Sequence, residues 1–202
     1  MPNLTRIKRD MSKLQPAVAS RIDFGVDEPA ERSNSYAPEQ LRKLFAALDR
    51  MDETLTKEQR YAIMERQGCG KGGAKKLREA MRAFAEANAG KTLAEKAALL
   101  GSAYCRAEMT ADGDIKVCWE FRDGDGRLSC GCGCFKDMAK RGLTPPGRVS
   151  RAYCGCCGGH IRYHYQTALG VGLRLKDVVS SPLDTDRAEG CGLLFEVLWP
   201  TA

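Results

Sequence analysis

Most of the sulfur and all of the imidazole in this 202-residue chain fall in one short region. Six of the ten cysteines and both histidines lie between Cys130 and His164. They form two glycine-rich runs, Ser-Cys-Gly-Cys-Gly-Cys-Phe at 129–135 and Tyr-Cys-Gly-Cys-Cys-Gly-Gly-His at 153–160. Thiolate and imidazole are the ligands that zinc selects, and they also act as nucleophiles or redox groups near neutral pH. The two runs are therefore where we expect the chemistry of this protein.

The spacing of these residues predicts one metal centre, and zinc is the ion that fits it best. Cys154 and Cys157 form the Cys-x-x-Cys step that is common in zinc sites, and Cys132 and Cys134 supply a second pair. The 19 residues between the pairs lie within the range seen for paired zinc ligands. His160 is the alternate fourth ligand. An iron–sulfur cluster fits less well, because a Cys-x-x-Cys-x-x-Cys run is missing.

The same residues allow a second kind of chemistry. Cys156 and Cys157 precede two glycines at a predicted helix N-terminus, where free N–H groups and the helix dipole lower the pKa of a thiol. Those N–H groups could also hold a substrate carboxylate, and a nearby histidine could act as a base. In this interpretation Cys157 and His160 are the catalytic candidates, and whether the protein is an enzyme stays open. In a third interpretation the cysteines only pack.

Both histidines are expected to face inward. At about 100° per residue, His160 and His164 share the apolar face of the predicted helix with Ile161 and Ala168. A helix that contains both Cys157 and His164 separates them by about 10 Å along its axis, so the two residues cannot bind one zinc ion together.

The elements that must position these residues follow from periodicity, capping patterns and turn signals. One predicted helix begins at Pro38, the next spans 56–67, and a third ends at about Gly90. Further helices are expected over 92–100, near 136–141, and from the second cysteine run to about 168. Strands are expected over 103–109, 115–121, 173–180 and 193–199. This order predicts an α+β fold, with N-terminal helices packed on an antiparallel sheet in β-β-α-β-β order.

The domain organisation predicted from these patterns is simple. Residues 1–36 are polar and weakly periodic, so we expect a mobile N-terminal arm with one short helix near Leu4–Leu14. Residues 37–202 then form a single domain, with a helical part over 37–101 and a cysteine-rich sheet part over 102–202.

Composition limits the partners of the chain. The net charge is +6, but it is spread along the chain, and only residues 71–82 crowd basic side chains together, which argues against a nucleic-acid partner. No apolar stretch reaches membrane-spanning length and no secretory signal begins the sequence, so we expect a cytoplasmic protein with no membrane partner. Thiols stay reduced there, which favours metal ligands or packing groups over disulfides.

Part of the chain, roughly Leu55 to Trp199, resembles a bacterial family of small cysteine-rich proteins. The residues that carry the resemblance are Ile63-Met64-Glu65, Cys132 and Cys134, the run 153–160, and the final hairpin with Gly190, Cys191 and Phe195. This region of the chain, as a whole, is similar to 4-vinyl-reductase-type ligand-binding domains and to L-2-amino-thiazoline-4-carboxylic acid hydrolase-like proteins. The resemblance implies an α+β fold with a small-molecule pocket between helices and sheet, and a cysteine-bound metal at its mouth in some members.

The chain departs from that family at the last hairpin. The expected Gly-x-x-x-Cys-x-Phe pattern appears as Gly190-Cys191-Gly-Leu-Leu-Phe195, so a ligand role for Cys191 does not carry over. No residue matches a hydrolase motif closely enough to transfer that activity. The roles of Cys69 and Cys118 are equally undetermined by the sequence.

These observations together predict a small-molecule binding or sensing domain with a Cys/His zinc centre. One alternative is a thiol-dependent hydrolase of a small carboxylate substrate. The other is a zinc-stabilised interaction module without a pocket. A small-molecule ligand is the expected partner, and a homo-oligomer is left open.

Overall fold

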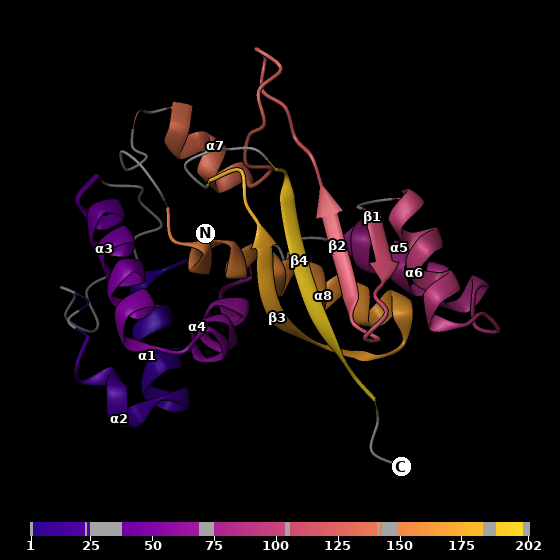
Figure 1. Cartoon of the computed structure of the whole chain (residues 1–202), viewed down its shortest axis with the longest axis horizontal. Helices are drawn as coiled ribbons and strands as arrows, with labels where there is room; N and C mark the ends of the chain where they lie inside the picture. Colours follow the sequence, from indigo (N-terminus) through magenta and orange to yellow (C-terminus); the bar gives the residue numbers. More distant parts are fainter. Residues whose placement is uncertain are drawn as a thin grey trace.

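The computed structural model describes residues 2–22, 24, 38–68, 75–103, 106–140, 142, 149–183 and 189–199, except the side chains of 103, 133, 134 and 137. Figure 1 shows its elements along the chain. The helices are α1 (Leu4–Leu14), α2 (Pro16–Ala19), α3 (Pro38–Thr54), α4 (Lys57–Met64), α5 (Lys75–Ala87), α6 (Leu93–Ala103), α7 (Gly133–Lys140) and α8 (Gly155–Leu169), with 3-10 helices η1 (Glu65–Gln67) and η2 (Arg151–Cys154). The strands are β1 (Arg106–Met109), β2 (Ile115–Trp119), β3 (Gly172–Ser180) and β4 (Cys191–Leu198).

The four strands form one antiparallel sheet in the order β1-β2-β4-β3. In chain order, β1 and β2 come before α7, η2 and α8, and β3 and β4 come after them. The predicted α+β class with an antiparallel sheet is confirmed. The last strand of the chain, β4, lies inside the sheet, where it pairs with β2 on one side and β3 on the other.

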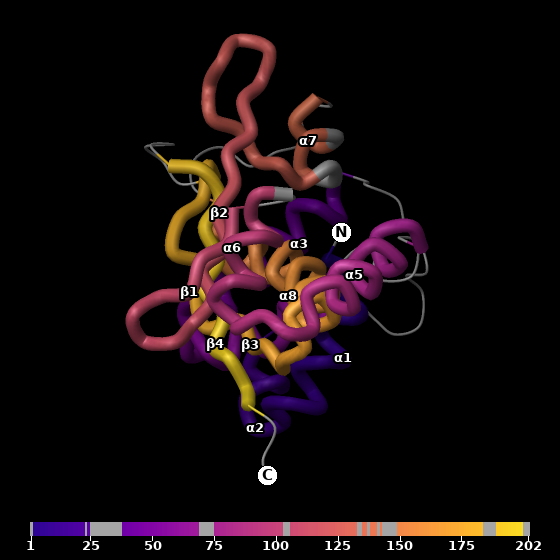
Figure 2. The backbone as a smooth tube through the Cα atoms, turned by 90° about the vertical axis from the view of Figure 1, so that its right-hand side faces the viewer, coloured from indigo at the N-terminus to yellow at the C-terminus, as the bar shows by residue number. Residues whose placement is uncertain are grey.

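One face of the sheet packs against helices. Side chains alternate along β4, where Leu193 and Phe195 are buried while Leu194 and Glu196 are half-buried, as expected for a strand with one face in the core. Helix α8 contacts β3 and also packs against α5. Figure 2 shows these helices to one side of the strands. The sheet therefore forms one wall of the core, and α8 runs along it.

The N-terminal segment contributes to the same core. Helix α1 spans the residues predicted for it, and its Leu4, Ile7 and Met11 are buried at i, i+3 and i+7 spacing. The buried carboxylate of Asp10 accepts a 2.8 Å hydrogen bond from Nε2 of Gln67 in η1. The predicted mobile arm of residues 1–36 therefore contains a helix that packs as part of the domain, which the polar composition of the segment concealed.

Local capping explains where two helices begin. Thr56 and Gln59 form the predicted capping box at α4, with hydrogen bonds of 2.9 and 3.3 Å. Thr92 and Glu95 do the same at α6.

Among the described helices, none is long and apolar enough to cross a membrane.

Candidate metal centre

Three segments that are distant in sequence bring cysteine thiols together at one end of the sheet. Cys130 and Cys132 lie just before α7, Cys157 lies in the first turn of α8, and Cys191 is the first residue of β4. Every cysteine whose side chain the structure describes is a free thiol.

The thiol contacts form a chain. Cys132 is hydrogen-bonded through its side chain to Cys157, and Cys130 is hydrogen-bonded to both Cys132 and Cys191. Cys154 lies close enough to interact electrostatically with Cys130 and with Cys157. The two cysteine runs of the sequence therefore meet through Cys132, as the metal prediction requires.

Backbone amides also point at sulfur in this cluster. The N–H of Cys132 donates to Sγ of Cys130 at 3.4 Å, and the N–H of Gly131 donates to the sulfur of Cys191. The close packing of this loop requires glycine at 131, because a Cβ there would lie 2.9 Å from Nε1 of Trp119. Amide donors of this kind stabilise negative charge on sulfur.

The proximity of the thiols governs their protonation. The hydrogen bond with Cys132, followed by burial, raises the pKa of the Cys157 thiol well above its ordinary value. Hydrogen bonds with Cys132 and Cys191 raise the pKa of Cys130, whereas the hydrogen bond with Cys130 lowers that of Cys191. Thiolates packed this closely repel one another, so Cys191 loses its proton more readily than Cys130 and Cys157 do, and a bound cation would favour loss of the remaining protons.

The predicted ligands have different fates. Cys132 and Cys157 come together, and Cys154 lies beside them with its Sγ 3.4 Å from the hydroxyl of Ser181. The side chain of Cys134 lies outside the described residues. His160 contacts the ring of His164, with ring centroids 4.7 Å apart.

Sequence reasoning missed Cys130 and Cys191 as members of the cluster. Cys191 shares the inward parity of Leu193 and Phe195, but nothing in the sequence fixes which segment its strand end meets. The contacts form a line rather than a ring, and among the described residues no group of three or more Cys, His, Asp or Glu could hold a metal ion as placed.

Helix α8 begins at Gly155, within the second cysteine run, as predicted. Helix α8 continues directly from η2, and the N–H of Gly155 already donates to carbonyls of Ala152 and Tyr153. The glycines of this turn permit close packing. A Cβ at Gly158 would lie 2.6 Å from Leu175, and one at Gly159 would lie 1.8 Å from the carbonyl oxygen of Glu65.

Cys156 and Cys118 have different surroundings from the cysteines of the cluster. Cys156 is buried and donates from Sγ to the carbonyl of Gln67 at 3.3 Å. Cys118 is half-buried on β2, on the polar face that its parity predicted. Cys69 and Cys105 lie outside the described residues.

Two cavities open near these elements. One, of about 560 Å³, is lined by Cys191 of the thiol cluster together with Cys118, Trp119, Lys116 and Arg106, among others. The family resemblance implies a pocket between helices and sheet, whereas this cavity lies at the end of the sheet beside the cysteines.

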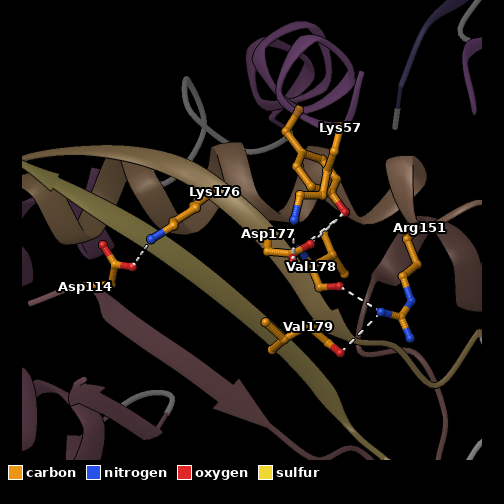
Figure 3. Close-up of polar contacts among 8 residues, drawn as sticks. Lys57, Asp114, Arg151, Lys176, Asp177, Val178 and Val179 are labelled. Atoms are coloured by element: carbon orange, nitrogen blue, oxygen red, sulfur yellow. Dashed lines mark hydrogen bonds and ion pairs between the residues drawn. The ribbon is translucent and has the colours of Figure 1, made fainter. Parts of the chain in front are cut away.

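The other cavity, of about 700 Å³, lies between α3, α4, η2 and β3 and is lined mainly by charged residues. Figure 3 shows how β3 contributes to it: Asp177 accepts from Nζ of Lys57 at 2.9 Å, and Arg151 donates to the carbonyls of Val178 and Val179. A register shift next to Asp177 lets this half-buried side chain face α4, although the adjacent Val178 is buried.

Comparison of the chain with protein-family models, with curated proteins and with solved structures finds no match in any of the three. The family resemblance therefore stays a prediction that depends on the residues that carry it.

Proposed function

We propose that this protein is a small-molecule binding domain built around a zinc–thiolate centre, with Cys130, Cys132, Cys157 and Cys191 as the ligands. The observation that carries the proposal is the double contact of Cys132, whose thiol meets Cys130 on one side and Cys157 on the other.

The chemistry of the cluster supports a cation. Thiolates that share a tetrahedral zinc lie about 3.8 Å apart for bonds of about 2.3 Å, which is close to the separation of hydrogen-bonded thiols. Zinc would replace the shared protons and turn the line of contacts into a closed set, and its charge would stabilise the thiolate of Cys157, whose pKa the hydrogen bond with Cys132 and burial raise. The segments that carry the four thiols already adjoin through these pairwise contacts.

The cavity beside Cys191 supports the binding role. It contains a centre ligand, a half-buried thiol at Cys118 and two cationic side chains, Arg106 and Lys116. A ligand there would lie next to the metal. This combination favours a binding domain over the interaction module without a pocket.

The alternative of a thiol-dependent hydrolase is less well supported. A nucleophilic cysteine needs a lowered pKa, whereas Cys157 has a raised one, and its contact is another thiol. The proposed base, His160, contacts His164. These contacts suit Cys157 better to metal ligation than to nucleophilic catalysis.

Metal analysis tests the proposal. Protein purified without added metal is expected to contain one zinc ion per chain, and Cys132→Ser is expected to lose it. Cys118→Ser is the matched control, since that thiol lies on the polar face of β2, and it should retain the ion. Retention of full zinc by Cys132→Ser would contradict the ligand set.

A measurement on the unaltered protein guards against a variant that does not fold. Titration of the reduced, metal-free chain with Co²⁺ is expected to give intense sulfur-to-metal absorption and the visible bands of a tetrahedral ion. Weak bands of an octahedral, oxygen-ligated ion would refute the thiolate centre.

A further inference from the structure

A second group of side chains of a metal-ligating type lies further along α8 than Cys157. His160 and His164 are one helical turn apart, and their rings meet edge-on with centroids 4.7 Å apart. They are the only two histidines in the chain. Side chains at i and i+4 lie on the same face of a helix, so both imidazoles project in one direction.

The more buried of the two imidazoles lacks polar partners. His164 is only 3% exposed, and neither its Nδ1 nor its Nε2 has a hydrogen-bond partner in the described structure. A neutral imidazole carries one donor and one acceptor, and leaving both unsatisfied in the interior is unfavourable. Such a group calls for an explanation in terms of something that binds it.

The surroundings of His164 keep it ready to act as a ligand. Burial, the neighbouring His160 and the guanidinium of Arg78 lower the pKa of His164 to about 4. Near neutral pH the ring is therefore unprotonated, and metal binding requires an unprotonated nitrogen. The edge of Tyr163, at a centroid distance of 5.2 Å, supports the ring from the same helix.

The separation of the two rings suits one ion. Nitrogens that share a tetrahedral zinc lie about 3.3 Å apart, given bonds of about 2.0 Å, and rings whose centroids are 4.7 Å apart can reach that separation by small rotations. We propose that His160 and His164 form a second metal site, which takes a divalent first-row transition ion through two imidazole nitrogens. Water completes the coordination, because the described residues offer no third ligand group.

The site is independent of the thiol centre and weaker than it. Imidazole ligands suit zinc, nickel and copper, whereas the thiol cluster selects soft ions more strongly. The positive charge of Arg78 beside His164 opposes a cation, which limits the affinity further. The thiol cluster is therefore expected to take the first equivalent of zinc and the histidine pair the second.

Nitrogen NMR of the histidine rings tests the site directly, because every imidazole signal comes from this pair. The reduced full chain, labelled with ¹⁵N in histidine and ¹³C in cysteine, is titrated with Zn²⁺ at pH 7. The expected result is a shift of the cysteine ¹³Cβ signals with the first equivalent. One ring nitrogen of each histidine then shifts with the second.

The possible outcomes separate the two sites. If the cysteine signals do not move and the histidine nitrogens shift with the first equivalent, the pair is a metal site and the thiol centre fails. If both ring nitrogens of His164 stay unchanged through several equivalents, the second site is refuted, and a bound water then accounts for the unsatisfied ring.

Variants supply a second readout. His160→Gln changes the half-buried member of the pair and is expected to weaken zinc binding at His164 by about tenfold or more. Arg78→Gln is the complementary variant. It is expected to tighten zinc binding at His164, because the substitution removes the positive charge that opposes the ion. Unchanged affinity in His160→Gln would mean that the two imidazoles do not share the ion.

Discussion

At the scale of single residues, Cys191 and Cys154 allow a sharp comparison between a proposed ligand and its neighbour. Both are about equally buried, at 8% and 6% exposed, so the two serine variants remove similar packing. Cys191 contacts Cys130 in the cluster, whereas Cys154 contacts the hydroxyl of Ser181.

We therefore expect Cys191→Ser to weaken zinc binding at least tenfold and Cys154→Ser to leave it nearly unchanged. Competition with a chromophoric zinc chelator measures both affinities. The reverse order would restore the Cys-x-x-Cys pair, Cys154 and Cys157, as the ligands from α8 and its N-cap.

His164 makes the stability of the metal-free protein depend on pH. Its pKa is lowered to about 4 in the folded protein, while an unfolded histidine titrates near 6.5, so the unfolded chain binds the proton more tightly. The contribution of His164 is complete above pH 6.5. It is lost as the pH falls from 6.5 to 4, by about 3 kcal/mol in total.

Urea unfolding between pH 7 and pH 4.5 measures this loss. The free energy of unfolding of His164→Gln is expected to depend less on pH over the same range. Carboxylates that titrate in the window affect both proteins alike. Parallel curves for the two proteins would mean that the ring at 164 is not buried unprotonated.

The sequence could predict some of these residues and not others, for a physical reason. Cys132 and Cys157 were identified because ligand spacing within each run is a local property. Cys191 joins them only because β4 inserts between β2 and β3, which places the start of β4 opposite the end of β2. The residues near Cys191 in the sequence do not indicate which strands pair at long range.

At the scale of elements, the first turns of α8 depend on glycine for close packing. A Gly→Ala change in an open helix stabilises a protein by about 0.5–1 kcal/mol. At Gly159 the new Cβ would lie 1.8 Å from the backbone oxygen of Glu65, which cannot rotate away. The segment that would have to move is fixed in turn, because the Glu65 carboxylate pairs with Arg162 and accepts from the N–H of Leu175 at 3.2 Å.

We therefore expect Gly159→Ala to destabilise the protein by more than about 2 kcal/mol, as overpacking of a rigid contact does. Gly90→Ala is the control, since a Cβ there meets nothing within 4 Å, and its effect should stay within about 0.5 kcal/mol. Chemical denaturation of the two variants gives the comparison. Equal stabilities would show that α8 and η1 do not approach as closely as described.

Periodicity predicted most elements, because each one buries a single face. The helices after Thr56 and Thr92 begin where their capping boxes place them, and β4 follows its period of two. That the helix N-terminus at Gly158-Gly159 could hold an anion stays a prediction, whereas the structure shows that both glycines permit close packing. Sequence shows that a glycine is present, but only the neighbouring backbone shows whether it serves a ligand or a packing contact.

At the scale of the whole molecule, the thiol cluster lies where the ends of several elements meet. Along the rest of their length these elements pack in the hydrophobic core. The loop before α7, the start of α8 and the first residue of β4 meet there, beside a cavity of about 560 Å³. An ion at this point would bind the folded protein and not the unfolded chain, and it would stabilise the fold by mass action. If the proposed centre forms, it would connect the stability of the domain to the shape of this cavity.

X-ray absorption at the zinc edge, on the unaltered protein loaded with one equivalent of zinc, tests the central claim most directly. The expected first shell contains sulfur alone, at about 2.3 Å. A shell dominated by nitrogen or oxygen at about 2.0–2.1 Å would contradict it, since the ion would then lie away from the four thiols.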